Sequence, residues 1–503
     1  MSPTEEPPSG GVEKRQPDDA SNIIVTHTVG NNVEDANLTP IPLPQEWSSA
    51  RKWLIVSSIS LITFMVNISL VICAPAALAI GDDLNEHSAF LLVFYITVDN
   101  LGEALAPLYV GPLSERLGRL PVIHIYNALF VVFTLVSGFA NSVAQIVVFR
   151  FLAGASVASI ALNSPIIGDL FTIEQRGGAI SIMSLIPILG TAVGPIAGGY
   201  VTQYLNWRWT FWLTAIGTAV LAGVLLLVMR ETYVPVIKRK ASGQKHQSAS
   251  KYIHGWNLKT VRAVTLLVVR PFRILFSSPI AVIMTLFLSL HYGYLSLVGA
   301  TMAMTFQQVY GFSESSSGLI YISLTVGTLS GSIFCRFTLD HFLIHGLPFR
   351  KKPPGFMPGP PYRSENRLIP MLPAMVTFPA GLLMYGWSLE YKVHWIVPTL
   401  ASALCGFSLS ASTAPIMSYL VDIFGDRAAS AIAAALPLRY VMGAFFPVAA
   451  PYMYESMGHG WANTFLALTL VAASPIPLLV TIHPSRLKWI DKLTARPEKM
   501  ARW

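Results

Sequence analysis

The chain has 503 residues, of which 53% are hydrophobic and 12% charged, and its formal net charge is +8. A soluble domain usually has about 25% charged residues, so the composition excludes a soluble globular protein and predicts a polytopic membrane protein. The three cysteines (Cys73, Cys335 and Cys405) lie in apolar segments without metal-ligand spacing. The sequence also has no phosphate-binding loop, nucleophile elbow or dinucleotide-binding motif, so we expect no metal, no cofactor and no enzymatic activity.

Residues 1–47 are polar and rich in proline, which predicts a disordered tail without a secretory signal. Because a transmembrane helix needs about 20 apolar residues, the rest of the chain predicts an all-α membrane protein of twelve spans, at 52–74, 90–112, 121–140, 143–170, 179–204, 209–229, 279–304, 316–340, 368–388, 394–420, 428–452 and 461–482. Pro165 and Pro415 fall inside two of these segments and are expected to interrupt them. The spans form two six-helix halves, 48–229 and 276–485, separated by a basic loop (230–275) and followed by a tail (486–503).

Lysine and arginine gather in alternate loops of this arrangement. They occupy the loops 112–120, 171–178, 230–275 and 341–367 and the C-terminal tail, whereas the intervening loops are mainly acidic. Because positive loops stay in the cytoplasm, we expect both termini and the central loop to be cytoplasmic. This bias, together with anionic lipid, accounts for the net charge without any nucleic-acid partner. Within the central loop, apolar and basic residues alternate over 252–276, which predicts a helix in the membrane interface.

The fifth predicted span contains a ladder of glycines at Gly190, Gly194, Gly198 and Gly199, with Pro195 directly after the second. Glycines four residues apart lie on nearly one helix face and allow close approach of another helix. The proline removes a backbone hydrogen bond and bends the helix. The ladder indicates either two packed helices that rock past each other or simple static packing.

Three of the charged residues inside the predicted spans are candidates for proton coupling. Arg150 lies near the middle of the fourth span, where an unpaired charge costs several kcal/mol, so the residue is a candidate for function. Asp99 and Glu103 lie one helical turn apart on one face of the second span, and either is a candidate to carry a coupling proton. The alternatives are a structural ion pair between Arg150 and these acids, a snorkelling arginine, or acids close enough to the outer surface to stay solvated.

Three motifs together resemble those of the major facilitator superfamily, and specifically of the fungal twelve-span drug:proton antiporters. They are the loop Gly111-Pro-Leu-Ser-Glu-Arg-Leu-Gly-Arg119, the segment Arg150-Phe-Leu-Ala-Gly154 and the glycine ladder at 190–199. The resemblance covers about residues 50–485. It implies a proton-coupled antiporter in which Arg150 takes part in coupling and the ladder marks antiport. The chain departs from the pattern at Glu115, where aspartate is usual, and at Asp99 and Glu103, where apolar residues are more common.

The residues of the loop 111–119 indicate a tight turn with charged side chains. Gly111 and Gly118 allow a tight turn between two helix ends, and Glu115 can pair with a helix N-terminus or an arginine. The resemblance implies a cytoplasmic gate that also involves Arg116, Arg119, Asp169 and Arg176, with Asp422 and Arg427 as its counterpart in the second half. The alternative is that the basic residues only anchor the loop at the membrane surface.

We expect two halves that enclose a central cavity and alternate between its two openings, exporting an amphipathic drug or secondary metabolite in exchange for protons. Candidate cavity residues are His291, Tyr294, Arg439 and Phe446. A polyamine or nutrient transporter of the same fold is the alternative. The expected partners are the substrate, protons and lipid, and the expected state is a monomer in the plasma membrane, with the vacuolar membrane as the alternative.

Overall fold

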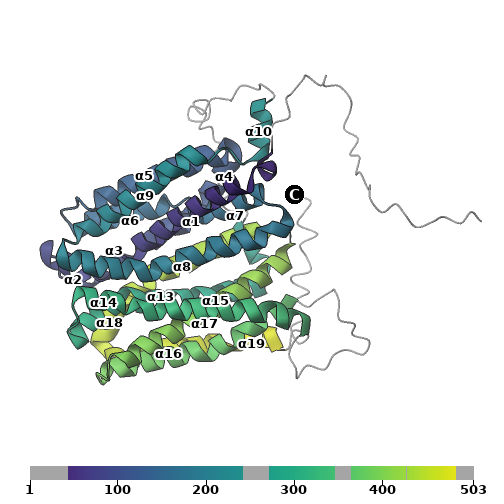
Figure 1. Ribbon diagram of the computed structural model, residues 1–503. Coiled ribbons are helices and arrows are strands. Elements are labelled where there is room, and N and C mark those ends of the chain that lie inside the picture. Colours follow the sequence, from purple (N-terminus) through teal and green to yellow (C-terminus); the bar gives the residue numbers. More distant parts are fainter. Residues whose placement is uncertain (1–42, 242–270, 346–363, 426–427, 483–503) are drawn as a thin grey trace, which may run out of the picture. The chain divides into compact units, whose positions relative to one another are not determined.

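A computed structural model describes residues 43–241, 271–345, 364–425 and 428–482, and within these ranges the regular elements are helices (Figure 1). The predicted terminal tails lie outside the described residues except for 43–47, and the predicted interfacial helix at 252–276 lies mostly outside them.

The helices of the first half follow the predicted spans closely. They are α1 (Ser49–Val71), α2 (Ala77–Asp83), α3 (Ala89–Thr97), α4 (Asp99–Leu117), α5 (Arg119–Ser137), α6 (Val143–Ala155), α7 (Ser159–Leu170), α8 (Ile173–Tyr204) and α9 (Arg208–Val228), followed by the short α10 (Val234–Ala241). The second span consists of α3 and α4, and the fourth consists of α6 and α7. Pro165 lies inside α7 without ending it.

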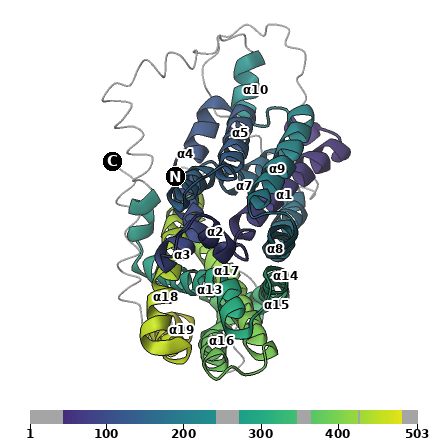
Figure 2. The same ribbon diagram turned by 90° about the vertical axis from the view of Figure 1, so that its left-hand side faces the viewer.

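The second half has the same plan, and Figure 2 shows its helices below those of the first half. Its elements are α13 (Pro279–Tyr310), α14 (Glu314–Leu319), α15 (Tyr321–His345), a 3₁₀ helix (Ser364–Met371), α16 (Leu372–Glu390), α17 (Ile396–Phe424), α18 (Ala428–Ala473) and α19 (Pro475–Ile482). Gly458, with φ 77° and ψ 169°, divides α18 into the eleventh and twelfth predicted spans. Pro415 lies inside α17.

Serine side chains fix where several helices begin. The hydroxyl oxygens of Ser88, Ser142 and Ser278 accept hydrogen bonds from backbone N–H groups in the first turns of α3, α6 and α13. Each bond satisfies a donor that has no partner within the helix. At the other end of α13, Gly311 adopts a left-handed φ of 69° and ends the helix.

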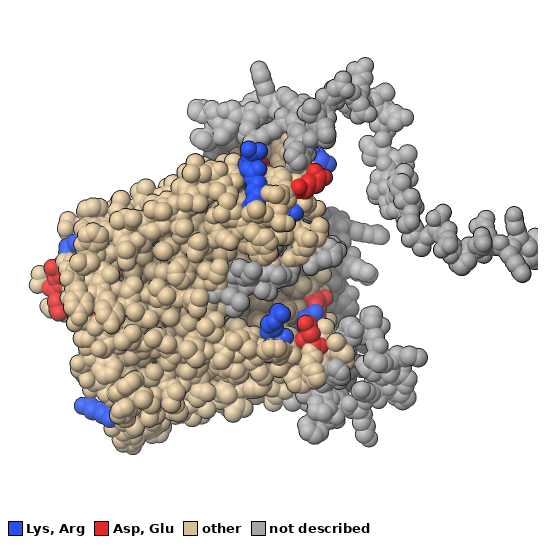
Figure 3. Space-filling view, viewed as in Figure 1, with Lys and Arg blue, Asp and Glu red and all other residues tan. Residues whose placement is uncertain are grey.

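The outer surface of the helices is apolar. Nine helices among the described residues are long and apolar enough to cross a membrane, the α18 segment Ala431–Thr481 being counted as one. Large side chains such as Leu227 (88% exposed) and Phe337 (73%) point outward. Figure 3 shows the charged residues of one face near its two ends, with a broad uncharged middle. A surface of this kind is stable in lipid and not in water, so the protein is a multi-pass membrane protein.

The apolar cores divide the bundle into two ends. One core, at the end where α1 stops, contains residues of both halves, including Tyr95, Phe211 and Phe306. At the opposite end, the described residues form one core within the first half, around Ile59, and another within the second half, around Ile416. We call these the shared-core end and the separate-core end. Among the described residues, the apolar core that joins the two halves therefore lies at one end of the bundle.

Candidate functional site

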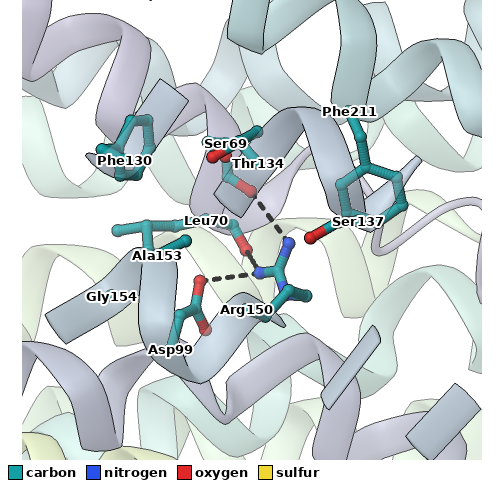
Figure 4. A pocket seen from close by; sticks show the side chains of 10 residues that line it. All are labelled: Ser69, Leu70, Asp99, Phe130, Thr134, Ser137, Arg150, Ala153, Gly154 and Phe211. Carbon is teal, nitrogen blue, oxygen red and sulfur yellow. Dashed lines mark hydrogen bonds and ion pairs between the residues drawn. The ribbon is translucent and has the colours of Figure 1, made fainter. Parts of the chain in front are cut away.

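The central feature of the first half is a buried ion pair between α4 and α6. Arg150 Nη2 lies 2.7 Å from Asp99 Oδ2, and the two residues are 3% and 4% exposed. The guanidinium also donates hydrogen bonds to the carbonyl oxygens of Ser69 (3.2 Å) and Leu70 (3.1 Å), which Figure 4 shows. It donates a third to the carbonyl oxygen of Ile96 (3.3 Å). The sequence left function and a structural ion pair open for Arg150, and the ion pair is present.

Helix ends supply the acceptors for Arg150. Ser69 and Leu70 lie in the last turn of α1, where carbonyl groups have no partner further along the helix. Ile96 lies just before the interruption at Val98, which separates α3 from α4. A charged donor forms stronger hydrogen bonds than a neutral one, so these carbonyls hold Arg150 in place independently of Asp99.

Two glycines bring α4 and α6 close enough for the ion pair. A Cβ atom on Gly102 would overlap the carbonyl of Phe151, and one on Gly154 would overlap the carbonyl of Asp99. Only glycine leaves room for backbones at this distance. Gly154 belongs to a motif found in the sequence, whereas Gly102 was missed, although it lies between the two acids of α4.

Glu103 lies one turn further along α4 and is 1% exposed. Its Oε1 has no hydrogen-bond partner, and it forms no ion pair among the described residues. Arg439 on α18 is close enough to interact with it electrostatically. An isolated buried carboxylate is unfavourable in its ionised form, so Glu103 differs sharply from the paired Asp99.

Aromatic residues of the second half surround Arg439. Its guanidinium lies 4.7 Å from the ring centre of Tyr292 and 5.0 Å from that of Tyr440. Tyr292 in turn donates a hydrogen bond of 3.0 Å to Asn100 Oδ1 on α4. The acids of α4 therefore face the second half across a layer of tyrosines.

The other predicted cavity residues lie within the packing of the second half. His291 is 1% exposed and lies between two aromatic rings. The centre of its ring is 4.2 Å from that of Phe287 and 4.9 Å from that of Phe378. Tyr294 is 5% exposed, and its hydroxyl is 2.6 Å from that of Thr469. Phe446 stacks on Tyr294 at 5.3 Å. In this conformation His291 and Tyr294 face no open space, and of the four predicted cavity residues Arg439 is the one that interacts electrostatically with Glu103.

A second polar cluster lies at the separate-core end of the first half. Gly118, with φ 101°, forms the turn between α4 and α5. Arg119 Nε lies 3.4 Å from Asp169 Oδ2, and the hydroxyl of Thr232 lies 3.3 Å from the same oxygen. Glu231 accepts hydrogen bonds from the backbone N–H groups of Arg119 (2.9 Å) and Leu120 (3.3 Å). A carboxylate at a helix N-terminus is favoured by the helix dipole.

Several expectations for this cluster need correction. Glu115 and Arg116 are exposed, and the carboxylate that binds the α5 N-terminus is Glu231. Gly111 lies within α4, with open space around it, and takes no part in the turn. The side chain of Arg176 lies outside the described part of the structure.

The second half has an ion pair that corresponds to the Arg119–Asp169 pair of the first half. Arg367 Nε lies 2.5 Å from Asp422 Oδ2, and its Nη1 lies 4.0 Å from Asp340. The partner proposed for Asp422 from the sequence, Arg427, lies outside the described residues. Like Arg119 and Asp169, this pair joins helices of one half.

The glycine ladder of α8 has two partners. Cβ atoms on Gly190, Gly194 and Gly198 would collide with α1 or the residue that follows it. A Cβ on Gly199 would collide with the Glu314 carbonyl of α14, and one on Gly318 with the Pro195 carbonyl. The first three glycines thus pack α8 within its own half, whereas Pro195 and Gly199 contact the second half.

Comparisons with known proteins agree with this architecture. The sequence matches the family model of the Major Facilitator Superfamily over residues 58–447. The chain is 35% identical over 450 residues to the efflux pump radE of Floropilus chiversii, covering 88% of this chain and 82% of that protein. It is 36% identical over 457 residues to the MFS-type transporter penM of Penicillium rubens, covering 89% and 88%. The partially occluded inward-open xylose transporter XylE of E. coli has a TM-score of 0.61 at 16% identity, covering 85% of this chain and 98% of that one, a likeness of fold.

Proposed function

The chain belongs to the major facilitator superfamily, and from this membership we propose that it is a proton-coupled antiporter that exports an amphipathic small molecule, such as a drug or a secondary metabolite. The observation that carries the proposal is the pair of buried carboxylates on α4. Asp99 is paired with Arg150, whereas Glu103, one turn away, forms no ion pair among the described residues and interacts with Arg439 only at longer range. The relatives named as efflux pumps and transporters support export of a small molecule.

The chemistry of exchange follows from the burial of Glu103. An ionised carboxylate without a partner costs several kcal/mol inside a protein. Binding of a proton removes this charge, and binding of a cationic or hydrogen-bond-donating substrate compensates it. Because both ligands use the same group, they exclude each other, and this competition is what an antiporter requires.

Alternating access is supported by the packing of the two halves. They share a core at one end and have separate cores at the other. The basic loop 112–120 lies at the separate-core end, so the positive-inside rule assigns that end to the cytoplasm. With this orientation both termini are cytoplasmic, and this conformation is closed toward the outside. The location that we propose is the plasma membrane.

The close contact of α8 with α14 supports the same scheme. Gly199 and Gly318 allow the two backbones to touch at the shared-core end. At these two glycines backbone meets backbone, so the contact can open there without repacking of side chains, with the hydrogen bond from Ser315 N–H to Gln203 Oε1 to break. We expect it to separate when the cavity opens toward the outside.

The test uses the purified protein in proteoliposomes with a fluorescent amphipathic dye and an imposed pH gradient. Glu103→Gln removes the titratable group and keeps the shape of the side chain. We expect this variant to lose gradient-driven accumulation of dye while it still exchanges dye between the two sides at equal pH. Glu455→Gln, which changes an exposed carboxylate, is the matched control. A Glu103→Gln protein that responds to the gradient as the unmodified protein does would refute the role of this carboxylate.

A further inference from the structure

A small cavity lies behind the Asp99–Arg150 pair, entirely inside the first half (Figure 4). Its volume is about 10 Å³, which is close to the minimum for one water molecule. The walls come from five helices of the first half, α1, α4, α5, α6 and α9, and from none of the second half. They are formed by Ser69, Leu70, Asp99, Phe130, Thr134, Ser137, Arg150, Ala153, Gly154 and Phe211.

Three of the side chains that line the cavity have a buried polar atom without a hydrogen-bond partner. These atoms are Asp99 Oδ1, Arg150 Nε and Thr134 Oγ1, and their residues are 4%, 3% and 2% exposed. An unpaired buried polar atom costs about 1–3 kcal/mol. A carboxylate accepts, a guanidinium donates and a hydroxyl does both, so the three atoms match the hydrogen bonds that one water molecule can form.

The orientation of Thr134 strengthens this reading. A serine or threonine inside a helix often bonds to the carbonyl four residues earlier. Ser137, on the same helix and lining the same cavity, does so with Phe133 at 2.9 Å. Thr134 does not, and its hydroxyl remains free for a ligand in the cavity.

We propose that one water molecule occupies this cavity, bound by Asp99, Thr134 and Arg150, and that protons reach and leave Asp99 through it. The inference rests on the proton coupling proposed above and adds the path of the proton. Asp99 receives the proton from the water and passes it to Glu103, one helical turn further along α4, where the proton competes with the substrate. A hydronium ion at the cavity gives its proton to Asp99 Oδ1 and becomes the resident water, and the reverse step releases the proton. No other reactant is needed.

The surroundings allow Asp99 to change its charge without loss of Arg150. When Asp99 is neutral, Arg150 is still held by the three carbonyl oxygens at 3.1–3.3 Å and by the water at Nε. The titratable groups around Asp99 are Arg150 on α6, Glu103 on α4, Cys73 after α1 and, from the second half, Tyr292 on α13. Tyr95 on α3, whose hydroxyl donates a hydrogen bond to the backbone carbonyl oxygen of Cys73, interacts with Arg150. The cavity residues of α5 and α9 are uncharged.

This placement separates the route of the proton from that of the substrate. Glu103 interacts electrostatically with Arg439 of the second half, whereas the cavity behind Asp99 is lined by the first half alone. Ser137, the last residue of α5, places one edge of the cavity close to the loop that connects α5 to α6. A proton can therefore approach Asp99 while the halves stay packed together at the shared-core end.

Thr134→Val tests the water site, because it replaces the hydroxyl by a methyl group of similar size. We expect gradient-driven efflux of dye to fall about tenfold or more, in line with the loss of a positioned proton-transfer group. Exchange of dye at equal pH, which needs no proton transfer to Asp99, should stay within about twofold of the unmodified protein. Thr134→Ser should restore driven efflux. Thr218→Val, which removes a buried hydroxyl of α9 outside the cavity, should leave both activities unchanged.

Two transport results would overturn the proposal. One is a Thr134→Val protein with normal driven efflux, and the other is an equal loss of driven efflux and exchange, which indicates a structural role. A density map that resolves waters gives an independent readout. It should show one water between Asp99, Thr134 and Arg150, absent in Thr134→Val, and an empty cavity would refute the site. If the unmodified protein shows no proton coupling but contains this water, the proposed function fails and the water site stands.

Discussion

Removal of the charge on Arg150 should destabilise the protein strongly, and the loss should depend on Asp99. Arg150→Met leaves the Asp99 carboxylate buried at 4% exposure without its partner at 2.7 Å. Breaking one side of a buried ion pair costs about 3–5 kcal/mol. Asp99→Asn should cost less, because the carbonyl oxygens of Ser69, Leu70 and Ile96 still accept hydrogen bonds from the buried guanidinium.

The double variant Asp99→Asn/Arg150→Met leaves no unpaired charge in the site. Replacing a buried ion pair as a whole is far less costly than breaking it. We therefore expect the double variant to be about as stable as the less affected single variant, which corresponds to a coupling energy of about 3–5 kcal/mol.

The assay is reversible unfolding in mixed detergent micelles, followed by circular dichroism. The exposed pair Asp83–Arg208 is the matched control, since it has the same 2.7 Å separation but side chains that are 46% and 27% exposed. Its double-mutant cycle should give about 0–1 kcal/mol. Additive losses at Asp99 and Arg150 would show that the two side chains are not coupled and would refute the reasoning.

The remaining predictions concern the helix contacts and the surface charges. Gly198→Val should push α8 from α1 and lower the melting temperature by several degrees, because a Cβ there overlaps the backbone after α1; an unchanged melting temperature would contradict this. Glu231→Gln should weaken the cap on α5 by about 1 kcal/mol and increase hydrogen exchange at the start of α5, an increase that the exposed Glu115→Gln should not produce. Hydrogen bonds from Arg208 and Trp207 lower the pKa of Asp83. The unmodified protein should therefore be slightly more stable than Asp83→Asn above the usual aspartate pKa of about 4. This difference in stability should vanish as the pH falls through the lower pKa that Asp83 has in the folded protein. A difference in stability that grows on acidification would contradict the prediction.

The sequence predicted the spans well because length and hydropathy determine them locally. It also identified Asp99, Glu103 and Arg150 as candidate functional residues, since charges are rare inside apolar segments. It could not tell which acid pairs with Arg150, because the choice depends on the interruption at Val98 and on the close packing at Gly102 and Gly154.

Residues that act through distant contacts were missed. Glu231 binds backbone groups more than 100 residues earlier, and no periodicity connects the two segments. A signal was present, however, because Glu231 is the one carboxylate in the basic stretch 230–275. His291 stays a predicted cavity residue, and in this conformation aromatic rings of its own half enclose it.

The central claim is that substrate and protons move in opposite directions through this protein. The most direct test imposes a gradient of a fluorescent amphipathic dye across proteoliposomes at equal pH and records internal pH at the same time. We expect dye movement down its gradient to drive protons the opposite way. Protons that move with the dye would indicate a symporter, and dye movement without any proton flux would indicate a facilitator; either result would contradict the account.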